Sequence, residues 1–161
     1  MYWNPMPTHR SDPAADSGPP LEQSRLLASV GYNCLQAYLT VVPGIKRQLA
    51  KYQLRPVEYT ILSLVDANPG INQKRLGQTI RVSPPNLATL LDRMQADGLL
   101  ERQRNPLDKR SHILVLTEAG RDLHAKAEKA ASRAETAPGL SDDEQRELLR
   151  LLQKIFLPAQ S

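Results

Sequence analysis

A run of polar residues in the middle of the chain has the side-chain types that read the edges of DNA bases. A helix over residues 83–97 would be apolar on one face, because helical spacing separates Leu87, Leu90, Leu91 and Met94. The other face would carry Ser83, Pro84, Asn86, Thr89 and Arg93. Asn can form paired hydrogen bonds with adenine, Arg can do so with guanine, and a Thr methyl group can meet a thymine methyl group. This pattern predicts a helix that packs on the protein with one side and enters the major groove of DNA with the other.

A second basic site is predicted at the tip of a hairpin. Two short strands, residues 99–104 and 111–116, flank the segment NPLDKR. Lys109 and Arg110 of this segment are placed to reach the adjacent minor groove, which attracts arginine where it is narrow. Asp108 stands too close to them to be a DNA ligand, so we expect it to hold the neighbouring Arg or a backbone N–H in position.

Caps and breaks in the sequence predict the elements that position these residues. Asn72 can cap a short helix that ends near Ile80, and Ser83 followed by Pro84 suits the start of the next helix. Two helices joined by about three residues have helix-turn-helix spacing, and a hairpin after them gives the winged version. The first of these helices begins with candidates for phosphate contacts, which are Gln73, Lys74 and Arg75.

Helical patterns flank this central region on both sides. We expect a helix from Leu21 to about Val42 that Pro43 and Gly44 kink or end. Its candidate buried residues are Leu26, Leu27, Val30, Leu35, Leu39 and Val42. Thr117 can cap a long helix to about Thr136, and residues 141–144 form a capping box for a last helix with a wide apolar stripe. The predicted fold is mostly α, with a flexible tail (1–20), N-terminal helices (21–53), a winged helix-turn-helix lobe (54–116) and C-terminal helices (117–161).

Composition narrows the classes of function. The formal net charge is +4, and residues 72–116 hold eight bases and four acids, so the basic excess lies where a nucleic-acid surface would need it. A single cysteine excludes an intramolecular disulfide and favours a reducing compartment, and no apolar run is long enough to span a membrane, so we expect a cytoplasmic protein. We find no phosphate-cradling glycine loop, no Ser/His/Asp arrangement and no metal-ligand spacing, so neither an enzyme nor a cofactor nor a metal site is expected.

Residues from Pro56 to about Ala127 resemble the winged helix-turn-helix core of the MarR (multiple antibiotic resistance regulator) family of bacterial transcription factors. The resemblance rests on DKRS at 108–111 and VLTEAG at 115–120, supported by LLDRM at 90–94 and NPGI at 68–71. It implies that the first and last helices form a homodimer on a pseudo-palindromic site in double-stranded DNA. It also implies a repressor that a small anionic or aromatic effector releases. At Gly31 with Tyr32, at LRP (54–56) and at NPG (68–70), the chain is similar to regulators of aromatic-acid catabolism, some of which sense CoA thioesters.

Three questions stay open at this point. Candidate effector-pocket residues are Tyr32, Tyr38, Tyr59, Arg25 and Arg47, because Tyr can stack on an aromatic acid and Arg can pair with its carboxylate. The tyrosines could equally line the dimer core. Some relatives sense peroxide through a cysteine on the first helix, as Cys34 with Tyr38 one turn on would allow. No Lys or Arg lies within a turn of Cys34 to lower its pKa, so a buried, inert cysteine is favoured. The last alternative is a winged-helix module that binds another protein, for which Arg110 is not needed.

Overall fold

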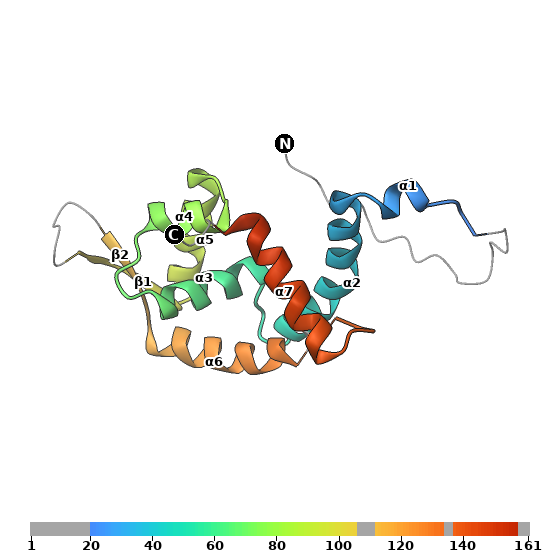
Figure 1. The fold of residues 1–161 in the computed structure, drawn as a ribbon. Coiled ribbons are helices and arrows are strands. Elements are labelled where there is room, and N and C mark those ends of the chain that lie inside the picture. Colours follow the sequence, from blue (N-terminus) through green and yellow to red (C-terminus); the bar gives the residue numbers. More distant parts are fainter. Residues whose placement is uncertain (1–19, 106–111, 134–136, 158–161) are drawn as a thin grey trace. The chain divides into compact units, whose positions relative to one another are not determined.

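The computed structural model describes residues 20–105, 112–133 and 137–157. The chain divides into two compact units, residues 1–34 and residues 35–161. The described elements, drawn in Figure 1, are α1 (Ser24–Leu27), α2 (Val30–Ala50), α3 (Pro56–Ala67), α4 (Gln73–Ile80), α5 (Pro84–Ala96), β1 (Leu100–Arg104), β2 (His112–Leu116), α6 (Glu118–Ser132) and α7 (Asp142–Phe156).

A short break separates α1 from α2 within the helix that the sequence predicts over residues 21–42. The side-chain amide of Asn33 donates hydrogen bonds to the carbonyl oxygens of Leu27 and Ser29, both at 2.8 Å. The bond to Leu27 satisfies a carbonyl at the end of α1, where helical partners run out, and the Ser29 carbonyl also accepts the Asn33 backbone N–H at 3.1 Å. Asn33 therefore stabilises the break, and α2 continues from Val30 through Pro43 to Ala50. The helix does not end at Pro43, since a proline removes only one helical hydrogen bond and the residues after it keep theirs.

Helix α3 is central to the unit of residues 35–161. It packs against α4, α6 and β2, and Figure 1 shows α6 on one side of it and the α4–α5 pair on the other. Its Ile61, Leu62 and Val65 are buried. They join a core that also contains Leu49, Leu54, Ile71, Leu76, Leu87, Leu91, Met94, Leu100, Leu114, Leu116, Ala127 and Ala131. This core fixes α5 and the hairpin on one body.

The hairpin pairs β1 with β2 in antiparallel register, from Leu100 opposite Leu116 to Arg104 opposite His112. The segment before α4 extends the pairing, because the Leu114 N–H donates to the Ile71 carbonyl at 2.9 Å. The base of the predicted wing is thus bonded to the segment that leads into the helix-turn-helix.

The caps predicted from the sequence are confirmed at three helix starts. The Asn72 side chain accepts a hydrogen bond from the Arg75 N–H at 2.9 Å, and the Thr117 hydroxyl accepts one from the Gly120 N–H at 3.0 Å. Ser141 and Glu144 form the predicted capping box. The mostly helical fold with a helix-turn-helix and a following hairpin is confirmed as well.

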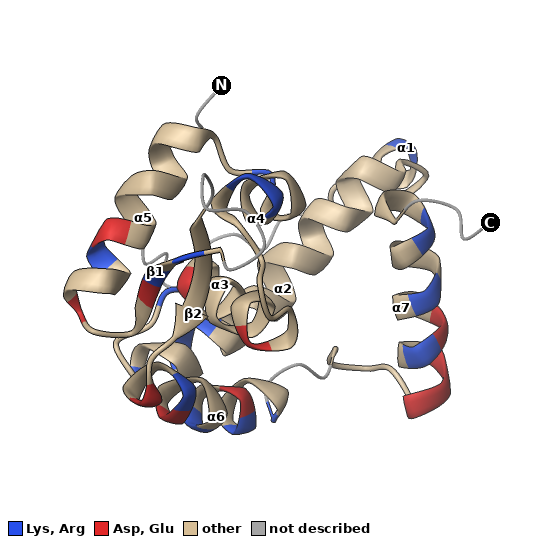
Figure 2. Ribbon diagram, turned by 90° about the vertical axis from the view of Figure 1, so that its left-hand side faces the viewer, with Lys and Arg blue, Asp and Glu red and all other residues tan. Residues whose placement is uncertain are grey.

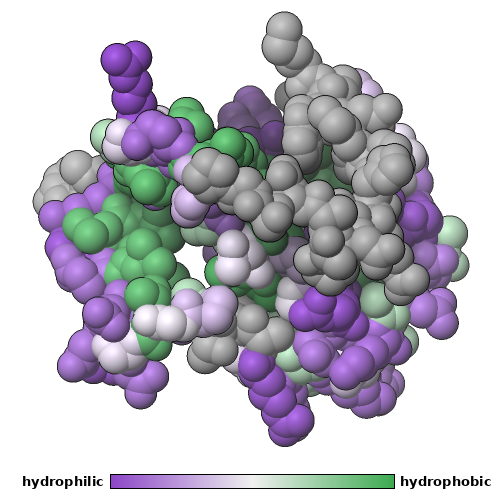
Figure 3. Space-filling view, turned by 90° about the vertical axis from the view of Figure 1, so that its right-hand side faces the viewer, coloured by the Kyte–Doolittle hydropathy of each residue, from purple (hydrophilic) through white to green (hydrophobic). Residues whose placement is uncertain are grey.

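The apolar stripes of the first and last helices are exposed in the single chain, so the expected burial in the first helix is wrong. Leu26, Leu27, Val30, Leu35 and Leu39 have between 46% and 68% of their surface exposed, and only Val42 is half-buried. Helix α7 has no buried side chain. Figure 3 shows hydrophobic side chains reaching the surface among polar ones. Helical periodicity identifies an apolar face but not the chain that covers it, and exposed apolar faces of this size mark interaction sites.

Cys34 lies on the same part of α2 and is exposed, so the expected burial of its thiol is also wrong. The reason is the same as for the leucines around it. Among the described residues, nothing packs over this stretch of the helix closely enough to remove its side chains from solvent.

Candidate nucleic-acid interface

Helix α5 presents the polar face that the sequence predicted to solvent. Its Leu87, Leu91 and Met94 are at most 1% exposed, and Leu90 packs against the same core. The five residues predicted on the outer side, Ser83, Pro84, Asn86, Thr89 and Arg93, are all exposed. The helix is therefore anchored by one stripe and exposes the other to solvent.

The start of α5 is shaped by its two prolines. Ser83 occupies the N-cap position with an extended backbone, but its side chain accepts no capping hydrogen bond in the described structure. Pro84 and Pro85, the first two residues of the helix, have no N–H to donate. The Ser83 hydroxyl therefore takes no part in holding the helix end and is exposed at the surface.

Helices α4 and α5 approach each other closely at Gly77. A Cβ atom on Gly77 would lie 3.0 Å from Cδ2 of Leu87, which is tighter than ordinary van der Waals contact. The turn after α4 uses Arg81 in the left-handed conformation (φ 55°), and the Val82 N–H bonds to the Gly77 carbonyl at 3.2 Å. This packing sets the angle between the two helices of the helix-turn-helix.

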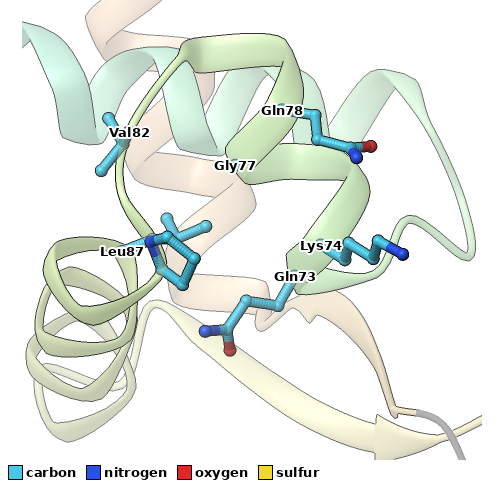
Figure 4. Close-up of a pocket in the computed structure, with 7 residues that line it drawn as sticks. Gln73, Lys74, Gly77, Gln78, Val82 and Leu87 are labelled. Carbon is cyan, nitrogen blue, oxygen red and sulfur yellow. The ribbon is translucent and has the colours of Figure 1, made fainter.

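A hollow of about 620 Å³ opens between these two helices. Figure 4 shows Gln73, Lys74 and Gln78 projecting from α4, with Leu87 across the hollow. The complete lining is Gln73, Lys74, Gly77, Gln78, Val82, Pro84 and Leu87. Of the three candidate phosphate contacts, the half-buried Gln73 and the exposed Lys74 line this hollow. Arg75 is also exposed, but it is not part of the lining.

The hairpin is tied to α5 by one arginine. Arg102 of β1 donates from Nη2 to the Asp92 carboxylate at 2.7 Å and from Nη1 to the Gln95 amide oxygen at 2.8 Å. These contacts fix the strand that leads to the wing against the helix that would enter a groove. Asp108, Lys109 and Arg110 themselves lie outside the described residues.

Charge is unevenly distributed over these elements. Figure 2 shows acids and bases alternating along α6 and α7, whereas the N-terminal half of α5 carries none. The charges of α5 are confined to Asp92 and Arg93 near its end. An uncharged helix start suits hydrogen bonding and shape contacts to bases, while the bases of α4 suit phosphates.

Glu58 is a buried acid that the sequence reading missed. It is 2% exposed, and its Oε2 accepts the Arg55 backbone N–H at 2.9 Å. Its Oε1 accepts from the Arg55 guanidinium, with Nη2 at 2.8 Å, and from the guanidinium of Arg93 on α5. Burial by itself raises the pKa of Glu58, but the Arg55 hydrogen bonds and the charges of Arg55 and Arg93 outweigh it and hold the pKa below its usual value.

Comparison with known proteins identifies the family. The MarR family model matches residues 52–111. A solved structure of the transcriptional repressor CouR, bound to a 23-mer DNA duplex, is 35% identical, and the match covers 85% of this chain and 99% of that one with a TM-score of 0.78. The chain belongs to the MarR family of transcriptional regulators.

Two further relatives extend the comparison. A structure of CouR bound to p-coumaroyl-CoA is 34% identical over 84% of this chain and 97% of that one, with a TM-score of 0.73. A transcriptional regulatory protein for the hcr operon of Thauera aromatica is 24% identical over 154 residues, which is 94% of this chain and 93% of that protein. The likeness therefore includes the helices on both sides of the winged helix.

The candidate effector residues of this MarR-family chain fall in both units. Arg25 is exposed in residues 1–34, where the Tyr32 hydroxyl donates to Gln23 Oε1 at 2.8 Å. In the second unit Tyr38 and Arg47 are exposed, while Tyr59 is half-buried. Tyr59 lines an open hollow of about 620 Å³ on α3 and α4, together with Pro56, Val57, Thr60, Ser63, Leu64, Thr79 and Ile80.

A Ser, an Asp and a His also meet beside Tyr59, contrary to the expectation that the chain has no such arrangement. His124 of α6 has Nε2 at 2.9 Å from the Ser63 hydroxyl and Nδ1 at 3.7 Å from the Asp66 carboxylate. The Ser63 hydroxyl already donates to the Tyr59 carbonyl at 2.9 Å, so the second contact takes its hydrogen from His124. A hydroxyl that accepts from the imidazole is not being activated as a nucleophile. The group joins α3 to α6, and its separation of 61 residues left no signal in the sequence.

The described ranges lack two other classes of site. None of the helices there combines the length and the apolar character that crossing a membrane requires. Nor does that part of the chain bring together three or more His, Cys, Asp or Glu side chains that could hold a metal ion.

Proposed function

We propose that this MarR-family chain is a repressor that binds duplex DNA as a homodimer and is released by a small aromatic or anionic effector. The observation that carries the proposal is the division of α5 into a buried apolar stripe and an exposed polar face. The second helix of a helix-turn-helix, anchored in this way, can lay its exposed face in the major groove.

The proposed DNA contacts come from three places. Ser83, Pro84, Asn86, Thr89 and Arg93 belong to α5, which would read bases and nearby sugar and phosphate groups. Gln73, Lys74 and Arg75 at the start of α4 would contact phosphates. Lys109 and Arg110 would reach the minor groove from the wing, with Asp108 supporting them. CouR, which is 35% identical, is a repressor solved on a DNA duplex, and this supports the assignment.

The proposed dimer uses residues 21–53 and 117–161. Their exposed apolar side chains on α1, α2 and α7 would be costly to leave in water, since burial of apolar surface contributes about 25 cal/mol per Å². A second copy of the chain offers the same stripes, as a two-fold interface requires. Two copies of α5 would then meet a pseudo-palindromic site whose half-sites lie about 34 Å apart.

The proposed effector is an aromatic acid or, more specifically, the CoA thioester of such an acid. CouR binds p-coumaroyl-CoA, and Tyr59 of this chain lines an apolar hollow that could accept an aromatic ring. Tyr32, Tyr38, Arg25 and Arg47 are the other proposed pocket residues. Such an effector would favour a dimer in which the distance between the two copies of α5 no longer matches the spacing of the half-sites. DNA affinity then falls by the coupling free energy, typically about 1–3 kcal/mol.

The experiment begins by selecting duplexes from a randomised library with the wild-type protein. Fluorescence anisotropy then compares the selected duplex with a scrambled duplex of the same length, with and without p-coumaroyl-CoA. We expect tight binding of the selected duplex alone and release by p-coumaroyl-CoA, but not by CoA. If no duplex is enriched, the winged helix binds another class of partner, such as a protein. If binding occurs and neither p-coumaroyl-CoA nor other aromatic thioesters release it, only the effector class is wrong.

A further inference from the structure

The buried carboxylate of Glu58 connects two segments that lie far apart in the sequence. Arg55 belongs to the link between α2 and α3, while Arg93 lies 35 residues beyond Glu58 on α5. Both guanidinium groups donate to the same Oε1 atom of Glu58. One carboxylate thus contacts the connection to α2 and the helix that would enter the groove.

The link that carries Arg55 is itself held in place. Gln53 has a left-handed backbone (φ 56°), and Leu54 is buried with its N–H bonded to the Leu49 carbonyl at 3.2 Å. Arg55 is the N-cap residue of α3, and its backbone N–H donates to Glu58. A change in the direction of α2 would therefore act on the Arg55 side of the Glu58 carboxylate.

On the other side, Arg93 shares a face of α5 with the proposed base-contacting residues. It follows Thr89 by four residues and Asn86 by seven, which places all three along one side of the helix. The apolar contacts of Leu87, Leu91 and Met94 hold α5 on the core but are themselves non-directional. A charged hydrogen bond to a buried carboxylate is directional and specifies one position.

We propose that Glu58 is a positioning residue of the DNA interface: through Arg93 it fixes how α5 lies, and through Arg55 it makes that position depend on the link to α2. The inference rests on the proposed function that α5 contacts DNA. It replaces the direct DNA contact proposed above for Arg93 with an indirect role. The Arg93 guanidinium donates to Glu58, and this bond keeps Asn86 and Thr89 in position to contact DNA. It also gives an effector bound near α2 a route to α5.

The test is a double-mutant cycle in the full chain, with Glu58→Gln, Arg93→Gln and the double variant. Dissociation constants are measured on the duplex selected by the wild type and on a scrambled duplex, well below the melting temperature of every variant. We expect each single variant to bind the selected duplex on the order of tenfold more weakly. The double variant should be no weaker than either single one, since both remove the same contact. Affinity for the scrambled duplex should change little.

Asp97→Asn is the matched control. Asp97 lies 3.9 Å from Nε of Arg93, so this variant also removes one negative charge beside Arg93, but its side chain is 57% exposed. We expect the affinity of the wild type. Should Glu58→Gln fail to fold, Arg55→Gln takes its place, because the Arg55 side chain is 53% exposed and lies outside α5. It should also weaken binding of the selected duplex several-fold, by less than Arg93→Gln.

Each contrary outcome is distinct. If Arg93→Gln loses affinity while Glu58→Gln and Arg55→Gln keep it, Arg93 contacts DNA directly and the inference is wrong. If all variants lose affinity equally on both duplexes, Glu58 only stabilises the fold and the inference is wrong. If the wild type enriches no duplex, the proposed function fails and the inference fails with it.

Discussion

Gly120 lies so close to Leu99 that a Cβ atom on Gly120 would be 1.9 Å from the Leu99 carbonyl oxygen. The Thr117 N–H donates to the same carbonyl at 3.2 Å, and the Thr117 hydroxyl donates to the Gly98 carbonyl at 2.6 Å. The start of α6 is thus bonded to the turn between α5 and β1. This contact explains why a glycine stands at the end of the VLTEAG segment: only a residue without a Cβ atom allows the approach.

Gly120→Ala should therefore destabilise the protein, although Ala is the better helix former. Backbone would have to shift to relieve the overlap, at a cost of about 3 kcal/mol. A loss of that size lowers the melting temperature by roughly 10 °C in a chain of this length. Differential scanning calorimetry of the two proteins measures this change in melting temperature. Gly31→Ala is the control, because a Cβ atom there meets nothing closer than 4.0 Å and should not lower the melting temperature. An unchanged melting temperature for Gly120→Ala would show that the contact is not as close as described.

Glu58 should make the free energy of unfolding depend on pH in the acidic range. Its pKa is held below the ordinary value of 4.5, so the stabilisation is complete above pH 4.5 and is lost as the pH falls through the lowered pKa of the folded protein. Glu58→Gln should cost about 2 kcal/mol at pH 7, because it removes the charge that accepts hydrogen bonds from two arginines, whose own side chains are half exposed. The difference between the two proteins should shrink below pH 4.5. Urea unfolding across the pH range measures this, and a difference that stays constant down to pH 3 would contradict it.

The apolar stripe of α7 should hold the proposed dimer together. Ile155→Glu places a charge where the side chain is 66% exposed in the single chain, and it should shift the protein towards a monomer. Gln153→Glu introduces the same charge at another exposed position of α7 and should leave the dimer intact. Analytical ultracentrifugation over a range of concentrations distinguishes them. Equal effects of the two substitutions would argue against α7 as the interface.

Lys74 should contribute a phosphate contact that does not depend on sequence. Lys74→Ala should weaken binding of selected and scrambled duplexes alike and reduce the slope of log affinity against log salt by about 1. Lys129→Ala removes the same charge from an exposed position on α6 and should leave the slope unchanged. If both variants reduce the slope equally, the effect reports net charge and not a contact.

Local features of the fold were predictable from the sequence, because their signals lie within a few residues. Asn72, Thr117 and Ser141 each cap the helix that they precede, and Pro84 begins α5 as the sequence indicates. The exposed face of α5 followed from the spacing of its leucines. The break between α1 and α2 did not, because it depends on side-chain bonds from Asn33 that helical periodicity does not report.

Long-range features were not predictable from one sequence. The contact of Glu58 with Arg93 spans 35 residues, and that of His124 with Ser63 spans 61. Glu58 is one of many acids on helices, and only the packing of α3 against its neighbours shows that it is buried. The exposure of Leu35, Cys34 and their neighbours was missed for a related reason. An amphipathic helix reads the same whether its apolar face meets its own chain or a second copy.

The central claim is that the exposed face of α5 reads a duplex, and Asn86→Ala tests it most directly. Affinity for the duplex selected by the wild type should fall by about 1–3 kcal/mol, with no comparable loss on a scrambled duplex. Ser132→Ala, at an exposed position on α6, should bind as the wild type does. Wild-type affinity and selectivity in Asn86→Ala, and likewise in Thr89→Ala, would contradict the claim.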